Sequence, residues 1–354
     1  MILRNKMIEI YAGKTALKTI KEQGFKQELF TSFLGASGGP KWFILYSLDK
    51  YLFGEFFKGR TEPLNLIGSS VGAFRSACLA QKDPVAAIER LATNYLETVF
   101  SANIKPAEIS LKANVLLDEV FGSSGVQEII DNSVFKAHFI VSKSKGLTAS
   151  ENKFMQGAGL LGSYILNRID RRLLKLQYER FIYQPANSSL DIDDSYGFKT
   201  TKIQFTSENI KDALLASGSI PMVMKGIKNI ANSPKGVYRD GGIIDYHFDF
   251  KVKNEGLVLY PHFCSNPKPG WFDKKSSRKV SPENYDKVVL ICPSEKFVQS
   301  LPYGKIPDRT DFTEMDAETR IKYWKAVLTQ TDQLANSLST VIVNKNIKII
   351  KELR

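Results

Sequence analysis

The sequence predicts an α/β fold with a central, mostly parallel sheet, and two patterns indicate it. Short apolar runs of strand length alternate with longer stretches whose apolar residues recur at helical spacing, which is typical of parallel strands covered by helices. The strands expected from these runs extend from near residue 30 to near residue 292. We therefore expect one domain over residues 1–354, with an insertion or cap segment near 150–200, rather than two separable domains.

The first elements follow one another closely along the chain. Leu29–Leu34 is typical of a strand that ends in a Gly-rich turn, and the stretch 42–53 then carries apolar residues at helical spacing. A second short strand, 64–67, runs into a turn rich in glycine and serine and then into a helix of small residues from Ala73. These two strands begin the predicted sheet.

The later elements are marked by a helix start and by further apolar runs. Asp83 and Pro84 predict the start of a helix, because Asp caps free amide groups and Pro suits the first helical position. Apolar residues between 85 and 99 then follow one helical face. The other expected elements are strands at 138–142, 202–206, 256–260 and 288–292, a polar loop at 187–197 and a helix at roughly 316–338.

Composition and charge narrow the class of protein. With 43% hydrophobic and 24% charged residues, the chain has the composition of an ordinary globular protein. The net charge of +12 is spread along the chain without an arginine-rich tract, so we expect no nucleic acid partner. The charge serves solubility alone or favours an anionic membrane surface.

No targeting or crosslinking signal stands out. A stretch of about 18 uncharged apolar residues is missing, so no transmembrane helix is predicted. Residues 1–25 carry no secretory signal, and the three distant cysteines have neither metal-ligand spacing nor a disulfide framework. We expect a cytoplasmic protein with, at most, peripheral membrane contact.

The segment Gly68-Ser69-Ser70-Val71-Gly72 matches the G-x-S-x-G pattern of a nucleophile elbow. A serine hydroxyl is a poor nucleophile unless it is exposed and lies next to a base. A tight strand-to-helix turn meets the first need, because it strains the backbone and points the serine oxygen outward. The register makes Ser70 the candidate nucleophile. A simple glycine and serine turn at a helix start remains the alternative for this motif alone.

Three companion segments make the motif more specific. They are a Gly-rich loop at 35–41, Ala216-Ser217-Gly218-Ser219-Ile220-Pro221, and Asp240-Gly241-Gly242. Together and in this order, across about residues 29–245, the four segments resemble those of the patatin-like phospholipases. The resemblance implies a three-layer α/β/α fold and a Ser–Asp dyad.

In this resemblance, Ser70 attacks an ester carbonyl and Asp240 takes the hydroxyl proton directly. Aligning Lys41 with the basic position of the family's loop places Gly38 and Gly39 on two of its glycines. Their backbone amides are candidates for the oxyanion hole, with Val71 as a further candidate. Lys41 is expected to contact a lipid headgroup or to hold the loop.

The loop departs from the family pattern at several positions. The usual Asp before the glycines is Ala36, the first glycine is Ser37, and the glycine after the basic residue is Trp42. Pro40 has no amide hydrogen to donate. The departures leave the dyad intact, but they indicate a divergent branch whose substrate cannot be carried over from the family.

A Ser–His–Asp triad is the alternative mechanism. The order Ser70, Asp240, His262 fits the chain order of α/β-hydrolases, and His247 follows Asp240 closely. His138 lies in an apolar strand pattern and is expected in the core. A dyad enzyme should keep substantial activity in His247→Gln and His262→Gln variants.

Three partial motifs fail on inspection. The loop at 35–42 resembles a phosphate-binding P-loop, but Pro40 replaces a glycine and Trp42 replaces the Ser or Thr. The G-x-G-x-x-G match at 157–162 has no strand before it. The acidic run at 191–194 lacks the glycine and the closing glutamate of a calcium loop. We expect no cofactor and no metal.

The segment 157–183 shifts from apolar to basic residues and falls between the Ser70 and Asp240 motifs, where a cap would lie. A helix of this kind could rest on an anionic membrane surface and guide lipid entry, although an ordinary surface helix packed on the core is the simpler alternative. The residues concerned are Leu160, Leu161, Tyr164, Ile165, Arg168, Arg171, Arg172, Lys175 and Arg180.

The sequence thus predicts hydrolysis of carboxylic esters on phospholipids or other lipid esters through an acyl-serine intermediate. The alternatives on the same dyad are a general esterase, a thioesterase or an acyltransferase. The alternative from another class is a catalytically silent lipid-binding protein.

Overall fold

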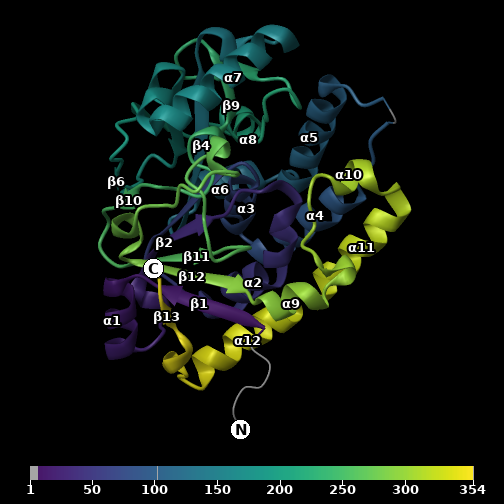
Figure 1. The fold of residues 1–354 in the computed structure, drawn as a ribbon. Coiled ribbons are helices and arrows are strands. Elements are labelled where there is room, and N and C mark those ends of the chain that lie inside the picture. The colour runs from purple at the N-terminus through teal and green to yellow at the C-terminus, as the bar shows by residue number, and fades with distance from the viewer. Residues whose placement is uncertain (1–6, 102, 354) are drawn as a thin grey trace.

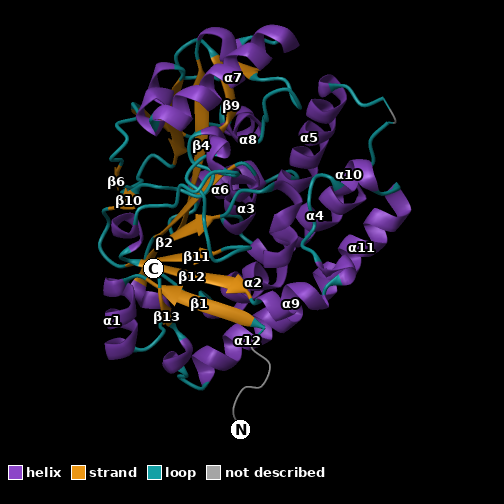
Figure 2. Ribbon diagram, viewed as in Figure 1, coloured by secondary structure: helices purple, strands orange, loops and turns teal. Residues whose placement is uncertain are grey.

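The computed structural model describes residues 7–101 and 103–353 and has a three-layer α/β/α fold (Figure 1). A large mixed sheet forms the middle layer, and helices flank it (Figure 2). The first six residues of the N-terminal stretch discussed above lie outside the described residues. Within the described ranges, no helix combines the length and the apolar character needed to cross a membrane.

The sheet is parallel in its centre, with antiparallel pairs on either side of the parallel strands and parallel pairs again at its two ends. The pairs that join β12, β11, β2, β3 and β4 are parallel, whereas β1 pairs antiparallel with β12, and β5 and β9 pair antiparallel with β4. Across the sheet the order is β13 (Lys351–Glu352), β1 (Ile8–Ala12), β12 (Val288–Pro293), β11 (Leu257–Pro261), β2 (Phe30–Gly35), β3 (Leu64–Ser69), β4 (Phe135–Ser144), β5 (Tyr178–Gln184) and β7 (Thr200–Gln204). Beside β4 also lie β9 (Val237–Asp240) and β8 (Ile227–Lys228), and a separate small sheet joins β6 (Ile192–Asp193) to β10 (Lys251–Val252).

The flanking helices bury apolar side chains against this sheet. α3 is buried along its whole length, because it lies directly behind β3 and β4 in the packed interior. The helices are α1 (Lys14–Gln23), α2 (Tyr46–Tyr51), α3 (Val71–Leu79), α4 (Pro84–Glu97), α5 (Pro106–Phe121), α6 (Gly125–Asp131), α7 (Lys153–Ile169), α8 (Ile210–Ser217), α9 (Glu295–Ser300), α10 (Asp311–Glu314), α11 (Ala317–Gln330) and α12 (Asp332–Val343).

The predicted strands are confirmed at β2, β3, β4, β7, β11 and β12, each of which overlaps an expected apolar run. Asp83 also caps α4 as expected, since its side chain accepts a hydrogen bond from the Ala86 amide. The buried central strands are those that apolar runs reveal best, because both of their faces are covered by helices.

Three expectations about elements are wrong. The stretch 42–53 is not one helix but a 3₁₀ segment (Gly39–Leu45), α2 and a π turn (Leu52–Phe56). The expected helix at 316–338 is two helices, because the Thr331 hydroxyl bonds the Leu328 carbonyl at 2.6 Å and ties the junction to Ser47 at 2.7 Å. The sheet also extends beyond the range 30–292.

The strands outside that range are β1, which lies between β12 and β13, and the edge strand β13. β1 alternates buried and half-buried residues, which is the burial pattern of a strand with one covered face. Its five residues carry a charged side chain and give a weaker apolar signal than the central strands. The loop expected at 187–197 is correct except for the two residues of β6.

Candidate active site

The turn between β3 and α3 holds Ser70 in a strained conformation. β3 ends at Ser69 and α3 begins at Val71, while Ser70 between them has φ 54° and ψ −135°. A positive φ of this kind costs a non-glycine residue roughly 1–3 kcal/mol. A Cβ atom on Gly72 would lie 1.9 Å from the carbonyl oxygen of Gly35, so the close approach of the two segments requires glycine. This packing holds the elbow in place.

Strand β4 brings Ser70 and Asp240 together. Ser69, the last residue of β3, pairs with Ile140, and Asp240, the last residue of β9, pairs with the adjacent Val141. The ends of two strands therefore reach neighbouring register positions of β4. The Ser70 hydroxyl donates a hydrogen bond of 2.9 Å to Asp240 Oδ2, although the two residues lie 170 positions apart in the chain.

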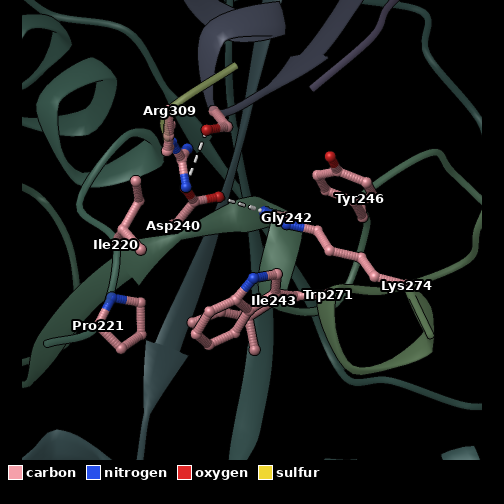
Figure 3. A pocket seen from close by; sticks show the side chains of 10 residues that line it. Ile220, Pro221, Asp240, Gly242, Ile243, Tyr246, Trp271, Lys274 and Arg309 are labelled. Carbon is pink, nitrogen blue, oxygen red and sulfur yellow. Dashed lines mark hydrogen bonds between the residues drawn. The ribbon is translucent and has the colours of Figure 1, made fainter. Parts of the chain in front are cut away.

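Further hydrogen bonds hold both partners. The Ser70 amide donates to Ser217 Oγ at 3.0 Å, and the Ser217 hydroxyl in turn donates to the Ile140 carbonyl at 2.7 Å. The Gly242 amide donates to Asp240 Oδ1 at 2.7 Å, which leaves Oδ2 facing Ser70 (Figure 3). The segments 216–221 and 240–242 that the sequence singled out therefore meet at the elbow.

Burial changes the proton affinity of Asp240. Both Ser70 and Asp240 are nearly inaccessible, with 5% and 6% of their surfaces exposed. Burial raises the pKa of Asp240 above its usual value, while the Arg309 charge, the Gly242 amide and the Ser70 hydroxyl act in the opposite direction. A carboxylate whose proton affinity is raised and which accepts the Ser70 hydrogen bond has the geometry of a general base.

The oxyanion candidates lie on the loop after β2 and at the first residue of α3. Gly38 and Gly39 have φ values of 139° and 58°, which glycine adopts without strain, and they begin the 3₁₀ segment after β2. Outside their own helical turns, none of the amides of Gly38, Gly39 and Val71 donates to the described residues. The described residues that line the pocket around Ser70 do not include these three.

The departures in the Gly-rich loop have structural reasons. Ser37 Oγ donates to the Ser69 carbonyl at 2.7 Å, so it ties the loop to the residue before Ser70. Trp42 is fully buried and stacks on Phe43, with ring centroids 4.9 Å apart. Lys41 forms an ion pair of 3.0 Å with Asp308. The side chains of Ser37, Lys41 and Trp42 therefore anchor the loop.

None of the three histidines bonds Ser70 or Asp240. His138 is buried in β4, as expected, and its Nε2 lies 2.6 Å from Ser188 Oγ. The rings of His247 and His262 are perpendicular, with centroids 4.3 Å apart, and each Nδ1 accepts a backbone amide hydrogen bond. Burial lowers the pKa of His262 to about 3 and that of His247 well below its usual value, so both rings are neutral.

A cavity with a volume of about 10 Å³ lies beside Ser70 and Asp240. That space holds roughly one water. An acyl chain can enter only if the walls move. Besides the two dyad candidates, the walls are Ile220, Pro221, Gly242, Ile243, Tyr246, Trp271, Lys274 and Arg309 (Figure 3).

Trp271, Lys274 and Arg309 are residues that sequence reasoning missed. They come from loops beyond the Asp240 motif, and only the path of the chain carries them to the pocket. A lone Trp, Lys or Arg in a loop has no local pattern that could mark it as part of a site.

The segment 157–183 differs from the expected basic membrane helix. It comprises most of α7, a 3₁₀ turn (Arg171–Leu176) and most of β5. Arg171 is buried and pairs with Asp273 at 3.4 Å, and Arg180 is buried and pairs with Asp245 at 2.6 Å. The prediction that these two arginines lie on the surface is wrong. Their charges hold loops together inside the protein.

The partial motifs have other structural roles. Asp194 pairs with Arg180 at 2.7 Å, and Asp191 pairs with Lys253 at 3.2 Å. Residues 157–162 lie inside α7, so they form no turn between a strand and a helix. Over the described ranges, no group of three or more His, Cys, Asp or Glu side chains is arranged to hold a metal ion.

The comparisons with known proteins give a family for the chain. Residues 56–247, more than half of it, match the model of the family described as Patatin, patatin-like phospholipase. The search of solved structures finds VipD from Legionella pneumophila at 12% identity and a TM-score of 0.37, covering 95% of this chain and 71% of that one. The search of curated proteins finds no match.

Proposed function

Because the chain belongs to the patatin-like phospholipase family, we propose that it is a lipid acyl hydrolase whose Ser70 and Asp240 form a catalytic dyad. One observation carries the proposal, namely the hydrogen bond of 2.9 Å from the Ser70 hydroxyl to Asp240 Oδ2. A serine hydroxyl becomes an effective nucleophile when a positioned base accepts its proton. The histidines are neutral and bond neither Ser70 nor Asp240, which favours a dyad over a triad.

The reaction follows from this geometry in two halves. Ser70 Oγ attacks the carbonyl carbon of a lipid ester as its proton passes to Asp240, and the carbonyl oxygen becomes an oxyanion. The Gly38, Gly39 and Val71 amides are the proposed donors to it. The leaving alcohol takes the proton from Asp240 as the acyl-Ser70 ester forms. Water, deprotonated by Asp240, then cleaves this ester and restores Ser70.

The same dyad would serve a general esterase, a thioesterase or, with an alcohol in place of water, an acyltransferase. A catalytically silent lipid-binding protein would keep the fold without the chemistry. The intact elbow and its bonded carboxylate favour an enzyme, because a strained serine is costly unless it is used.

An active-site probe tests the proposal. We expect a fluorophosphonate to label the wild type and to leave Ser70→Ala unlabelled, because the probe reacts with an activated serine. Asp240→Asn should label at least about 100-fold more slowly, the contribution of a general base. His247→Gln and His262→Gln serve as controls that retain labelling. If His262→Gln lost labelling while His247→Gln kept it, a Ser–His–Asp triad would be the better assignment.

Lipid-product profiling identifies the substrate. The wild-type protein is incubated with mixed membrane extracts, and released fatty acids, lysolipids and transesterified lipids are measured against the Asp240→Asn protein. Free fatty acids support a hydrolase, whereas new acyl esters support an acyltransferase. Labelling without any lipid product would indicate that the substrate is a soluble ester and not a lipid.

We also propose that α7 rests on an anionic lipid surface through an apolar face made of Phe154, Leu161, Ile165 and Ile169. These side chains follow one side of the helix and are 86%, 61%, 51% and 71% exposed. The exposed cations Arg168 and Lys175 near its C-terminal end favour anionic headgroups. A lipid surface is also where the proposed substrate lies.

Hydrogen bonds connect α7 to both sides of the pocket. Gln156 accepts a bond of 2.7 Å from the Met222 amide, next to Pro221, and Asn167 donates a bond of 2.8 Å to Asp273, next to Lys274. A force on α7 would therefore reach the two loops that close the pocket.

Vesicle binding checks the docking face. Replacing Leu161, Ile165 and Ile169 by Ser should cut cosedimentation with vesicles of anionic and zwitterionic phospholipid at least about tenfold, because the apolar area buried in lipid is lost. Hydrolysis of a short soluble ester should not change. The matched control replaces the exposed Leu111 and Val115 of α5. Equal loss in the control, or self-association in place of vesicle binding, contradicts a lipid occupant.

A further inference from the structure

We propose that Arg309 and Lys274 form an anion-binding subsite beside Ser70, which takes a phosphate or carboxylate group carried by the substrate close to its scissile ester. This inference rests on the proposed acyl hydrolase function. It adds the chemical class of the substrate, an anionic lipid ester. Both residues lie outside the span that matches the family, residues 56–247.

The two cations approach the candidate dyad from different loops. Both line the pocket that contains Ser70 and Asp240. In Figure 3, Lys274 extends toward Gly242 and Asp240 from one side, and Arg309 reaches the same carboxylate from the other. Both charges oppose the burial that raises the pKa of Asp240, and Arg309 does so more strongly. An anion bound between them would therefore lie next to the serine.

The charge of Arg309 acts on Asp240, but among the described residues its side chain forms no direct ion pair or hydrogen bond. The residue is nevertheless half-buried. The acidic neighbour in sequence, Asp308, is already paired with Lys41 at 3.0 Å. By contrast, each of these buried arginines pairs with a carboxylate: Arg75, Arg171, Arg180 and Arg239.

A guanidinium without an ion-pair partner in a narrow pocket is unfavourable unless a ligand supplies the opposite charge. Removing a charge from water costs free energy that a partner must offset. Arginine presents a planar fork of donors that fits two oxygens of a carboxylate or phosphate. In contrast to the paired arginines, the guanidinium donors of Arg309 are therefore available to an anion from outside the chain.

The loop that carries Arg309 is held rigidly. Asp311 is fully buried and accepts hydrogen bonds from Trp324 Nε1 at 2.9 Å, from Lys305 Nζ at 2.6 Å and from the Asp308 amide at 2.9 Å. The side chain of Arg309 crosses Gly39, where a Cβ atom would lie 2.7 Å from Arg309 Nε. The guanidinium is thus positioned before any ligand arrives, which reduces the entropy lost on binding.

Lys274 supplies the second cation. Its ammonium lies 4.2 Å from the centroid of the Tyr246 ring and 5.7 Å from that of Trp271. It enters no ion pair with the described carboxylates, and part of its side chain is exposed, which gives an anion access from solvent. Burial and the nearby Arg309 charge lower the pKa of Lys274 to about 7, so a ligand of opposite charge stabilises the charged form of Lys274.

Binding to a protein that cannot turn over tests the subsite directly. In a Ser70→Ala background, calorimetry would follow soluble dihexanoyl phosphatidate, the hemisuccinate of dihexanoylglycerol and uncharged dihexanoylglycerol, each below its critical micelle concentration. We expect the two anionic lipids to bind at least tenfold more tightly than the neutral one. Adding Arg309→Gln or Lys274→Gln should erase this difference. Lys58→Gln removes an exposed charge remote from any proposed role and should not.

The phosphatidate and hemisuccinate arms separate the two sources of the anion. Tighter binding of phosphatidate assigns a phosphate, and tighter binding of the hemisuccinate assigns a carboxylate. Equal binding of charged and neutral lipids, or an unchanged preference in the Arg309→Gln protein with a native melting temperature, overturns the subsite. Arg309→Lys, which keeps the charge, should recover part of the preference.

Turnover then distinguishes this inference from the proposed function. In the wild-type Ser70 background, Arg309→Gln should lower kcat/KM about tenfold more for the anionic lipids than for dihexanoylglycerol, and the additional loss should lie in KM. An equal fall in kcat for both classes would make Arg309 a group that acts on the reacting oxygen, and the subsite would be wrong. Anion-dependent binding without hydrolysis of any ester would support the anion subsite and contradict the proposed enzymatic function.

Discussion

Ser70 and Asp240 meet inside the protein, and the surroundings of the carboxyl group set its proton affinity. Burial is the largest influence on Asp240 and raises its pKa, whereas Arg309 and the Gly242 amide lower it. The positive charge and the hydrogen-bond donors that face the carboxyl group favour its ionised form. The proposed base is therefore stronger than an exposed Asp.

This pKa predicts the acid side of the activity profile. The base must be ionised, so kcat/KM for a short soluble ester should fall as pH drops through a pKa above the ordinary value of 3.8. Arg309→Gln removes the strongest opposing charge and should move this limb to higher pH. A limb at or below the ordinary value, or no shift in the variant, would contradict the assignment of Asp240.

The same shift has a consequence for stability. A raised pKa in the folded state means that folding favours the protonated carboxyl, so the stability gained at low pH is lost as pH rises through that pKa. Asp240→Asn should therefore melt at the same temperature as the wild type or higher at neutral pH, while kcat falls roughly 10²–10⁴-fold. Calorimetry and ester hydrolysis measure the two effects. A lower melting temperature would point to a structural role.

At the scale of the elements, β5 and the loop after Asp240 are joined by a buried ion pair. Arg180 donates to both oxygens of Asp245, at 2.6 and 2.8 Å, and to Asp194 at 2.7 Å. The Asp245 carbonyl in turn accepts the Ser69 hydroxyl at 2.6 Å, next to Ser70. The pair thus connects an antiparallel strand to the elbow.

Breaking this pair should be costly. Arg180→Met leaves the buried Asp245 charge without its partner, and we expect a loss of about 3–5 kcal/mol in the free energy of unfolding. Urea denaturation measures it. The control is Lys199→Met, whose exposed ion pair with Glu179 spans 3.7 Å and should contribute less than about 1 kcal/mol. Equal effects would mean that Arg180 contributes no more than a surface charge.

At the scale of the whole molecule, the family span 56–247 is only part of the packed unit. It lacks β1, β2, β11, β12 and β13. β3 is buried throughout and pairs with β2. A fragment without β2 would therefore expose β3 as an apolar sheet edge. The pocket also takes Trp271, Lys274 and Arg309 from beyond the span.

A fragment of residues 56–247 should therefore fail to fold. We expect it to be insoluble or to lack a cooperative urea transition, whereas the full chain should unfold in one transition, as a single domain would. Circular dichroism and limited proteolysis follow both proteins. A soluble fragment with a cooperative transition would show that the chain has an independent inner unit and would contradict the expected single domain.

The sequence by itself determined the central strands, the elbow and the motifs that meet there. Each depends on neighbouring residues: apolar runs mark buried strands, and glycines around Ser70 mark a turn that other residues cannot make. The strand β1 was not predicted, because its apolar pattern is short and weak. The break at Thr331 was not predicted, because the helical pattern continues through it. The order of the motifs also suggested Ser70 and Asp240 as partners.

Only the tertiary structure decided which charges lie inside and which residues close the pocket. Arg171 and Arg180 look like surface cations in sequence, but buried carboxylates far along the chain pair with them. Lys274 and Arg309 belong to no motif, yet they line the pocket beside Ser70. The physical reason is that charge pairing and burial depend on distances across the fold, whereas a sequence pattern reports only what adjacent residues can do.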